Sequence, residues 1–106
     1  MRAVRESKAG GQNVMSYYGL EFVKEVGRPY ITIGSIRNVS HVSGESLKQA
    51  LKSIRARQHR ILLNRGNREF HTTCIKLKDL PALNVALGNK IDKLVEDLMN
   101  EYRTLL

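Results

Sequence analysis

The basic side chains in SLKQALKSIRARQHR, residues 46–60, are the residues whose type and spacing most clearly suggest a chemistry. Five Lys or Arg residues fall within these fifteen positions, and no Asp or Glu lies among them. Between residues 45 and 68, seven basic residues face one acid, Glu45, so this stretch has a net charge of +6 out of +8 for the chain. Positive charge concentrated in this way attracts polyanions, and nucleic acid phosphates above all.

The candidate contacts form two groups. Ammonium and guanidinium groups contact phosphates whatever the base sequence, whereas the amides of Gln and Asn can pair with adenine through two hydrogen bonds. The expected nucleic-acid-binding residues are Lys48, Lys52, Arg55, Arg57, Arg60, Arg65 and Arg68, with Gln49, Asn64 and Asn67 as possible base contacts. For the amides, the alternative is that they are ordinary polar residues of turns and of the protein surface. For the basic residues the alternatives are an acidic protein partner and a solvated face.

Catalysis finds little support in the sequence. Ser43, Ser46 and Cys74 are the nucleophiles we considered, and none has a recognisable elbow or a neighbouring base. We therefore expect a protein that is not an enzyme and needs no cofactor. Because Cys74 is the only cysteine, no internal disulfide can form, which fits a reducing compartment.

A metal site and a membrane location are also disfavoured. His71 and Cys74 are three residues apart, but the other histidines, His41 and His59, come from separate segments. The start MRAVRESKAGG has no apolar signal core, and no apolar run approaches the length of a membrane span. The sequence thus predicts no metal, no membrane partner and a cytoplasmic location in a bacterial host cell.

Residues 14–106 are expected to form a single α+β domain with two β-hairpins, a central basic helix and C-terminal helices. Residues 1–13 are polar, lack a period and are expected to be a mobile basic tail. The first hairpin is predicted to turn at Gly27-Arg28-Pro29. The second is predicted to join ILLN to REFHTTCIKL through a loop at residues 64–67.

The basic residues are placed on the central helix by its periodicity. From Ser43, the residues Leu47, Ala50, Leu51 and Ile54 follow the spacing of one buried helical face. At about 100° per residue, Lys48, Lys52, Arg55 and His59 are expected to share a second, outward face of this helix. With Arg60, Arg65 and Arg68 on the next hairpin, the basic helix and loop are expected to form one surface.

Two further helices are expected near the C-terminus. LPALNVAL follows Asp79 and stops at Gly88. The last helix has an apolar stripe formed by Ile91, Leu94, Val95, Leu98, Met99, Tyr102 and Leu105. This stripe is either part of the core or the seam of a homodimer. The expected seam consists of Ile91, Leu94, Val95, Leu98 and Tyr102.

Several short motifs appear in this order of elements. They are Tyr18-Gly19, then Gly27-Arg28-Pro29-Tyr30 before an Ile-Thr-Ile strand, Gln49 and Ile54 in the helix, residues 68–77 in the second hairpin, and Lys78-Asp79-Leu80 leading into Asn84 and Leu87. Over roughly residues 14–100, this pattern resembles the N-terminal domains of phage antirepressors, which are related to those of baculovirus BRO proteins.

The resemblance implies a phage or prophage regulator that modulates transcriptional repression by contacting DNA, a repressor protein or both. The alternative is a protein-interaction module that inactivates a repressor or host protein without contacting DNA. A homodimer through the C-terminal helix would suit a symmetric operator or an oligomeric repressor.

Overall fold

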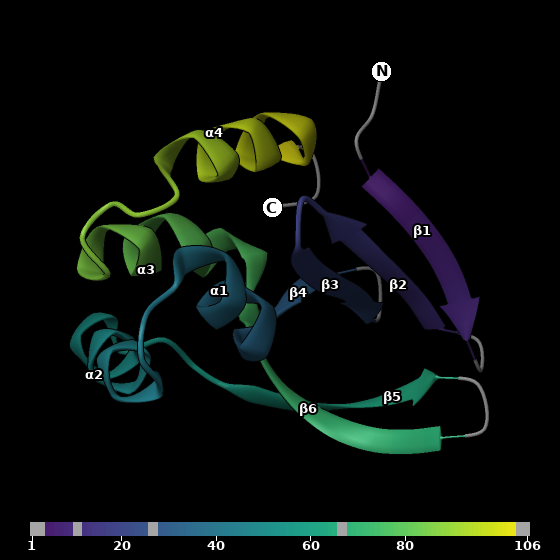
Figure 1. Ribbon diagram of the computed structural model, residues 1–106. Helices are drawn as coiled ribbons and strands as arrows, with labels where there is room; N and C mark the ends of the chain where they lie inside the picture. The colour runs from purple at the N-terminus through teal and green to yellow at the C-terminus, as the bar shows by residue number, and fades with distance from the viewer. Residues whose placement is uncertain (1–3, 10–11, 26–27, 66–67, 104–106) are drawn as a thin grey trace.

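The computed structural model describes residues 4–9, 12–25, 28–65 and 68–103, which form an α+β fold around an antiparallel sheet (Figure 1). The strands, given in their order across the sheet, are β1 (Val4–Ala9), β2 (Gln12–Tyr17), β3 (Leu20–Glu25), β4 (Arg28–Thr32), β6 (Arg68–Lys76) and β5 (His59–Arg65). The helices are α1 (Ile33–Ser40), α2 (Gly44–Ile54), α3 (Leu80–Ala86) and α4 (Asp92–Glu101), with a 3₁₀ turn, η1 (Leu77–Asp79), before α3.

The sheet begins as a meander of β1 to β4 and is extended by the β5–β6 hairpin. After β4 the chain passes through α1 and α2, and returns at the outer edge as β5. The next strand, β6, then lies between β5 and β4, where Ile75 pairs with Ile31. The outer strands β1 and β5 also come into contact, which shows that the sheet is strongly curled.

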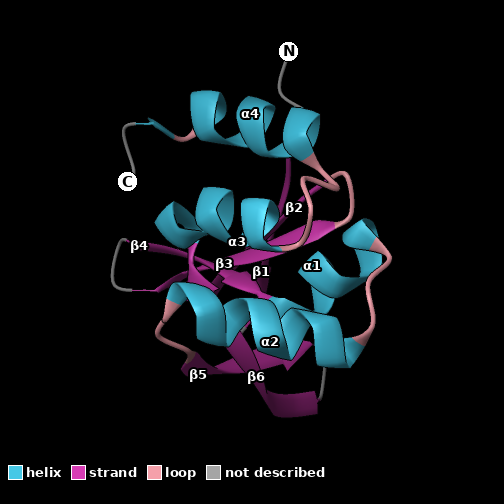
Figure 2. Cartoon of the chain, turned by 90° about the vertical axis from the view of Figure 1, so that its left-hand side faces the viewer, coloured by secondary structure: helices cyan, strands magenta, loops and turns pink. Residues whose placement is uncertain are grey.

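Each face of the sheet has its own apolar cluster, because neighbouring residues of a strand point to opposite faces. Phe22, Ile31 and Ile75 belong to the larger core, which also contains the inward side chains of all four helices. The helices lie on that side of the sheet (Figure 2). On the opposite face, Val23, Ile61, Leu63 and Cys74 form a smaller cluster with Tyr30 at its border.

Both predicted hairpins are confirmed, and the expected α+β class is correct. The turns were predicted at residues 27–29 and 64–67, but Arg28 and Pro29 belong to β4, and Asn64 and Arg65 belong to β5. The links between the paired strands fall at residues 26–27 and 66–67, which are outside the described residues. The expectation of a mobile tail over residues 1–13 needs correction: Val4–Ala9 forms β1 and pairs along its whole length with Gln12–Tyr17 of β2. This pairing was missed because residues 1–13 show no clear alternation of their own.

The turn between β2 and β3 requires glycine. Tyr18 and Gly19 have φ of 48° and 91°, as in the two-residue turns that match the twist of a hairpin. A Cβ on Gly19 would lie 2.7 Å from Cγ1 of Val39, so α1 also closes over this position. Both the backbone angle and the close packing therefore exclude a side chain here.

Helix α2 begins as predicted but ends earlier than its periodic pattern suggested. The Ser46 amide donates a hydrogen bond to Oγ of Ser43, which caps the first turn. At the other end, Arg55 has a φ of 55°, and the amides of Arg55 and Ala56 donate to the carbonyls of Lys52 and Leu51. This is a Schellman motif with arginine where glycine is usual.

Because the helix stops at Ile54, His59 does not share a helical face with Lys48 and Lys52, and the sequence-based placement of His59 was wrong. It is instead the first residue of β5.

The junction between α3 and α4 is held by Asn84, a buried residue of α3. Its Oδ1 accepts a hydrogen bond from the amide of Ile91, and its Nδ2 donates to Oδ1 of Asp92. The Asn89 amide, in the link after Gly88, donates to the Asn84 carbonyl. The side chain of Asn84 thus satisfies the Ile91 amide and binds the Asp92 carboxylate at the start of α4.

Replacing Asn84 with alanine leaves the buried amide of Ile91 without its acceptor. We expect a loss of about 1–3 kcal/mol in the free energy of unfolding, measured by urea denaturation. Asn100→Ala, at an exposed position on α4, is the matched control and should have a much smaller effect. Equal losses for both variants would show that the Asn84 hydrogen bonds contribute nothing specific.

Arg55 offers a test of the helix end that is independent of charge. A residue with a Cβ is strained at positive φ, whereas glycine is not. Arg55→Gly should therefore be more stable than Arg55→Ala by about 1 kcal/mol in urea denaturation, although both remove the same guanidinium. Equal stabilities would contradict the left-handed conformation at this residue.

Candidate nucleic-acid interface

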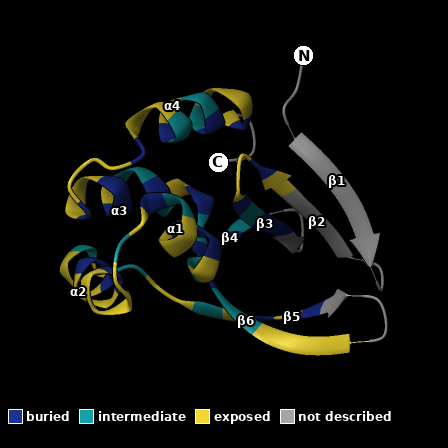
Figure 3. Cartoon of the chain, in the orientation of Figure 1, coloured by how far each residue is buried: buried dark blue, intermediate teal, exposed yellow. Residues whose placement is uncertain are grey.

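The basic side chains predicted to bind nucleic acid are exposed wherever the structure describes them. We call Lys48, Lys52, Arg55, Arg57, Arg60 and Arg68 the basic region. Arg65 is described only in its backbone, where it pairs with Arg68. In Figure 3 the exposed colour covers the outer turns of α2 and much of β6.

No described carboxylate neutralises the basic region. An ion pair in the described part of the chain joins Lys93 to Asp97 within α4, at 3.3 Å between Nζ and Oδ1. No corresponding pair within 4.0 Å is found for the six side chains of the basic region among the described residues. Their charges are available to an external anion.

Helix α2 orients its lysines through its buried face. Leu47, Ala50 and Leu51 are buried in the larger core, so the opposite side of the helix must face solvent. At 100° per residue, Lys48 and Lys52 lie 40° apart around the helix axis, one turn from each other along it. They therefore form an adjacent pair of cations on the exposed side of α2.

The dipole of α2 favours this distribution of charge. The only acid of the helix, Glu45, lies in its first turn, and Lys52 lies in its last turn. Arg55 and Arg57 follow directly after the helix. Positive side chains near a helix C-terminus are stabilised by the partial negative charge of the free carbonyls. That attraction offsets part of the repulsion among the cations.

The β5–β6 hairpin divides its arginines between two faces. Arg60 pairs with Thr73, which shares a face of β6 with the core residue Ile75, so Arg60 lies on the side of the sheet that carries the helices. Arg68 lies at an even spacing from Thr72 and Cys74, and so on the opposite face of the hairpin. Arg60 is therefore on the same side of the sheet as α2. Arg68 is on the other side, so it does not belong to the single surface that the sequence led us to expect.

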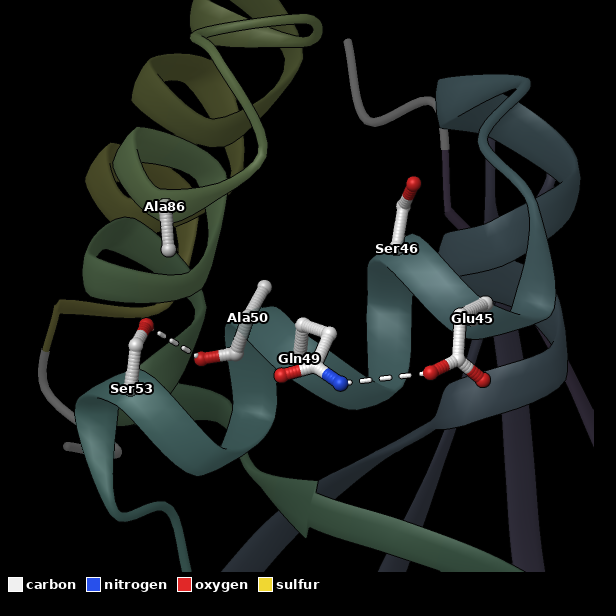
Figure 4. Close-up of a pocket in the computed structure, with 6 residues that line it drawn as sticks. All are labelled: Glu45, Ser46, Gln49, Ala50, Ser53 and Ala86. Atoms are coloured by element: carbon white, nitrogen blue, oxygen red, sulfur yellow. Dashed lines mark hydrogen bonds between the residues drawn. The ribbon is translucent and has the colours of Figure 1, made fainter.

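Of the three possible base contacts, the structure describes the side chain of Gln49 alone. Gln49 lines an open groove of about 510 Å³ between α2 and α3, with Glu45, Ser46, Ala50, Ser53 and Ala86 (Figure 4). Its Nε2 donates a hydrogen bond to Oε1 of Glu45 at 3.2 Å. Asn64 is placed opposite Glu69 in the β5–β6 pairing, and Asn67 lies outside the described residues.

The apolar stripe of α4 is part of the core. Ile91, Val95, Leu98 and Tyr102 are buried, Leu94 and Met99 pack against them, and the Tyr102 ring meets Phe22 edge to face at 5.4 Å between centroids. Of the two alternatives for this stripe, the core is therefore correct. A dimer seam made from these side chains is wrong, because they are already covered within one chain.

His59 is a residue of this region whose role the sequence did not predict. Its ring lies edge-on to the ring of Tyr30, with 5.0 Å between centroids. Burial, the charge of Arg57 and the charge of Lys76 lower the pKa of His59 from its ordinary value of 6.5, and Asp79 opposes them. Tyr30 is distant in sequence, so only the strand pairing could have revealed this contact.

Tyr17 and Tyr18 lie at the β2–β3 turn, near α4. Burial raises the pKa of Tyr17, and the nearby carboxylates of Asp97 and Glu101 raise it further, which places this tyrosine beside α4. Tyr18 is 69% exposed, but it is at the β2–β3 turn and its ring meets that of Tyr17. These two tyrosines therefore do not interleave with the basic region as a platform for stacked bases would.

Two general features complete the description of the surface. Within the described residues, no group of three or more His, Cys, Asp or Glu side chains is arranged to hold a metal ion. No helix in the same ranges has the length and apolar character needed to cross a bilayer.

In comparisons with known proteins, the chain matched no family model, no curated protein and no solved structure.

Proposed function

We propose that this chain binds DNA through α2, the link that follows it and the adjacent part of the β5–β6 hairpin. The observation that supports this most directly is the set of exposed cations that no described carboxylate neutralises. Lys48, Lys52 and Arg60 lie on the helix side of the sheet, and Arg55 and Arg57 connect them along the chain. Phosphates suit such a surface because each contact releases condensed counterions.

The contact is made mainly to the phosphate backbone. Gln49 is the only one of the three candidate amides whose side chain the structure describes, and it is hydrogen-bonded to Glu45. Lys and Arg side chains that contact phosphates give affinity and orientation, but carry no sequence information directly. The binding we propose is therefore strongly dependent on salt and weakly dependent on sequence.

The biological role that we propose for this binding is modulation of transcriptional repression in a phage or prophage, as in the antirepressor domains that the chain resembles. The order of its elements supports the proposal: an early hairpin, a basic helix, a second hairpin and closing helices. A protein-interaction module without DNA contact is the competing function. It predicts no salt-dependent affinity for random duplex DNA.

Removing three charges from α2 and its C-terminal end tests the interface. If Lys48, Lys52 and Arg55 each neutralise one phosphate, their joint replacement by glutamine should flatten the slope of log K against log salt by about 2.7 on B-DNA. Fluorescence anisotropy with a random duplex provides the measurement. Lys90, Lys93 and Arg103 replaced together by glutamine remove the same charge around α4 and should leave the slope nearly unchanged. If both triple variants changed the slope equally, net charge alone would explain the binding, and the surface that we assign would be rejected.

The hairpin provides a second, paired test. Arg60 lies on the helix side of the sheet and Arg68 on the other, so a duplex resting against α2 reaches Arg60 more readily. Arg60→Gln should lower the salt slope by about 0.9, and Arg68→Gln should have little effect. The reverse order would place the bound DNA on the opposite face of the hairpin and reject the surface that we assign.

A further inference from the structure

His59 has a buried nitrogen without a partner. Its Nε2 is shielded from solvent and has no hydrogen-bond partner in the described part of the chain. The ring rests against Tyr30 of β4, and the residue pairs with the buried Cys74 of β6. Buried polar atoms usually have hydrogen-bond partners, so an exception at the start of β5 calls for an explanation.

The surroundings of this ring favour its neutral form. The charged groups that act on it are Arg57 in the link after α2, Lys76 at the end of β6 and Asp79 in η1. Two are cations and one is an anion, and burial adds a cost for a charged ring. An imidazolium would also bring a second N–H, for which the buried side of the ring offers no acceptor.

The position of His59 links it to the basic region. Arg57 precedes it by two residues, and Arg60 follows it directly, pointing to the opposite face of the sheet. Fixing the first residue of β5 against Tyr30 therefore determines where both guanidinium groups emerge from the backbone. A loose start of β5 would let the link between α2 and the hairpin move.

We propose that His59 is a positioning residue of the DNA-binding surface, whose neutral ring clamps the start of β5 against Tyr30 and so holds Arg57 and Arg60 in place. Acidification releases the clamp and weakens DNA binding. This inference rests on the proposed function for its readout, but the clamp itself can be observed without DNA.

The direction in which the affinity for DNA changes with pH distinguishes this clamp from simple protonation of a basic surface. Protons gained on the surface of a basic protein add positive charge, which strengthens binding to a polyanion. A surface that titrates without rearranging thus binds more tightly as the pH falls. The clamp predicts the opposite result.

The affinity for a short random duplex should be measured at about pH 7.5 and at about pH 5, a lower point chosen because the pKa of His59 lies below the ordinary histidine value, at constant ionic strength. We expect a several-fold weaker affinity at the lower pH for the wild-type chain. His59→Phe keeps an aromatic ring against Tyr30 that cannot be protonated, so it should retain its affinity at both values. His71→Gln, on the same hairpin, should keep the acid-dependent loss. An affinity that rises on acidification, or an equal loss in His59→Phe, overturns the proposal.

A second measurement covers the case in which His59→Phe does not fold or DNA does not bind. Imidazole NMR signals of the wild-type protein report the protonation of His59, and amide hydrogen exchange reports opening at Arg60 and Ile61. Lower protection factors at these amides, which correct the exchange rate for its intrinsic dependence on pH, over the range in which His59 gains its proton support the clamp. Protection factors that stay constant over that range overturn it. An absence of DNA binding at either pH refutes the proposed function alone.

Discussion

The pairing of β4 with β6 determines where every described side chain of the basic hairpin points. Tyr30, Ile31 and Thr32 lie opposite Lys76, Ile75 and Cys74. A shift of one residue would turn Ile75 away from the helices and bring a polar neighbour into the core, which the buried face does not allow. Once Ile75 is fixed, the alternation of β6 and its pairing with β5 place Arg60 on the helix side and His59 against Tyr30.

Helix α2 obeys a similar constraint. Burying a leucine side chain contributes about 1.5–3 kcal/mol, whereas a pair of like charges one turn apart costs about 0.2–0.5 kcal/mol. Leu47 and Leu51 are both buried, so apolar packing decides how the helix is rotated. Lys48 and Lys52 then face solvent even though the repulsion between them costs free energy. The rotation of α2 is therefore set by its apolar residues and not by its lysines.

The sequence predicted the features that depend on local patterns. The buried face of α2, the capping serine at its start and both hairpins follow from the spacing of apolar and turn-forming residues. The end of α2 was not predicted, because Arg55 adopts a left-handed conformation that usually calls for glycine. Strand β1 was missed because its own residues show no alternation. It is a strand because it pairs with β2.

The candidate site was predicted in composition but not in geometry. The sequence identified the cations, yet the division between Arg60 and Arg68 depends on the register of the hairpin. The contact of His59 with Tyr30 likewise depends on β6, which brings β4 and β5 together from separate parts of the chain. Contacts of this kind arise from sheet order, for which a single sequence has no periodic signal.

The charge of the remaining surface constrains how a polyanion can approach. Helix α4 carries Asp92, Glu96, Asp97 and Glu101 against one lysine, Lys93, and it lies at the opposite end of the molecule from α2 and the β5–β6 hairpin (Figure 1). In the DNA binding that we propose, repulsion at α4 and attraction at α2 would orient the domain before contact, as in other electrostatically steered encounters. Because the inner face of α4 is already used in the core, a second copy or a protein partner that approaches this end of the domain meets an acidic surface. The apolar side chains of α4 are not available to it.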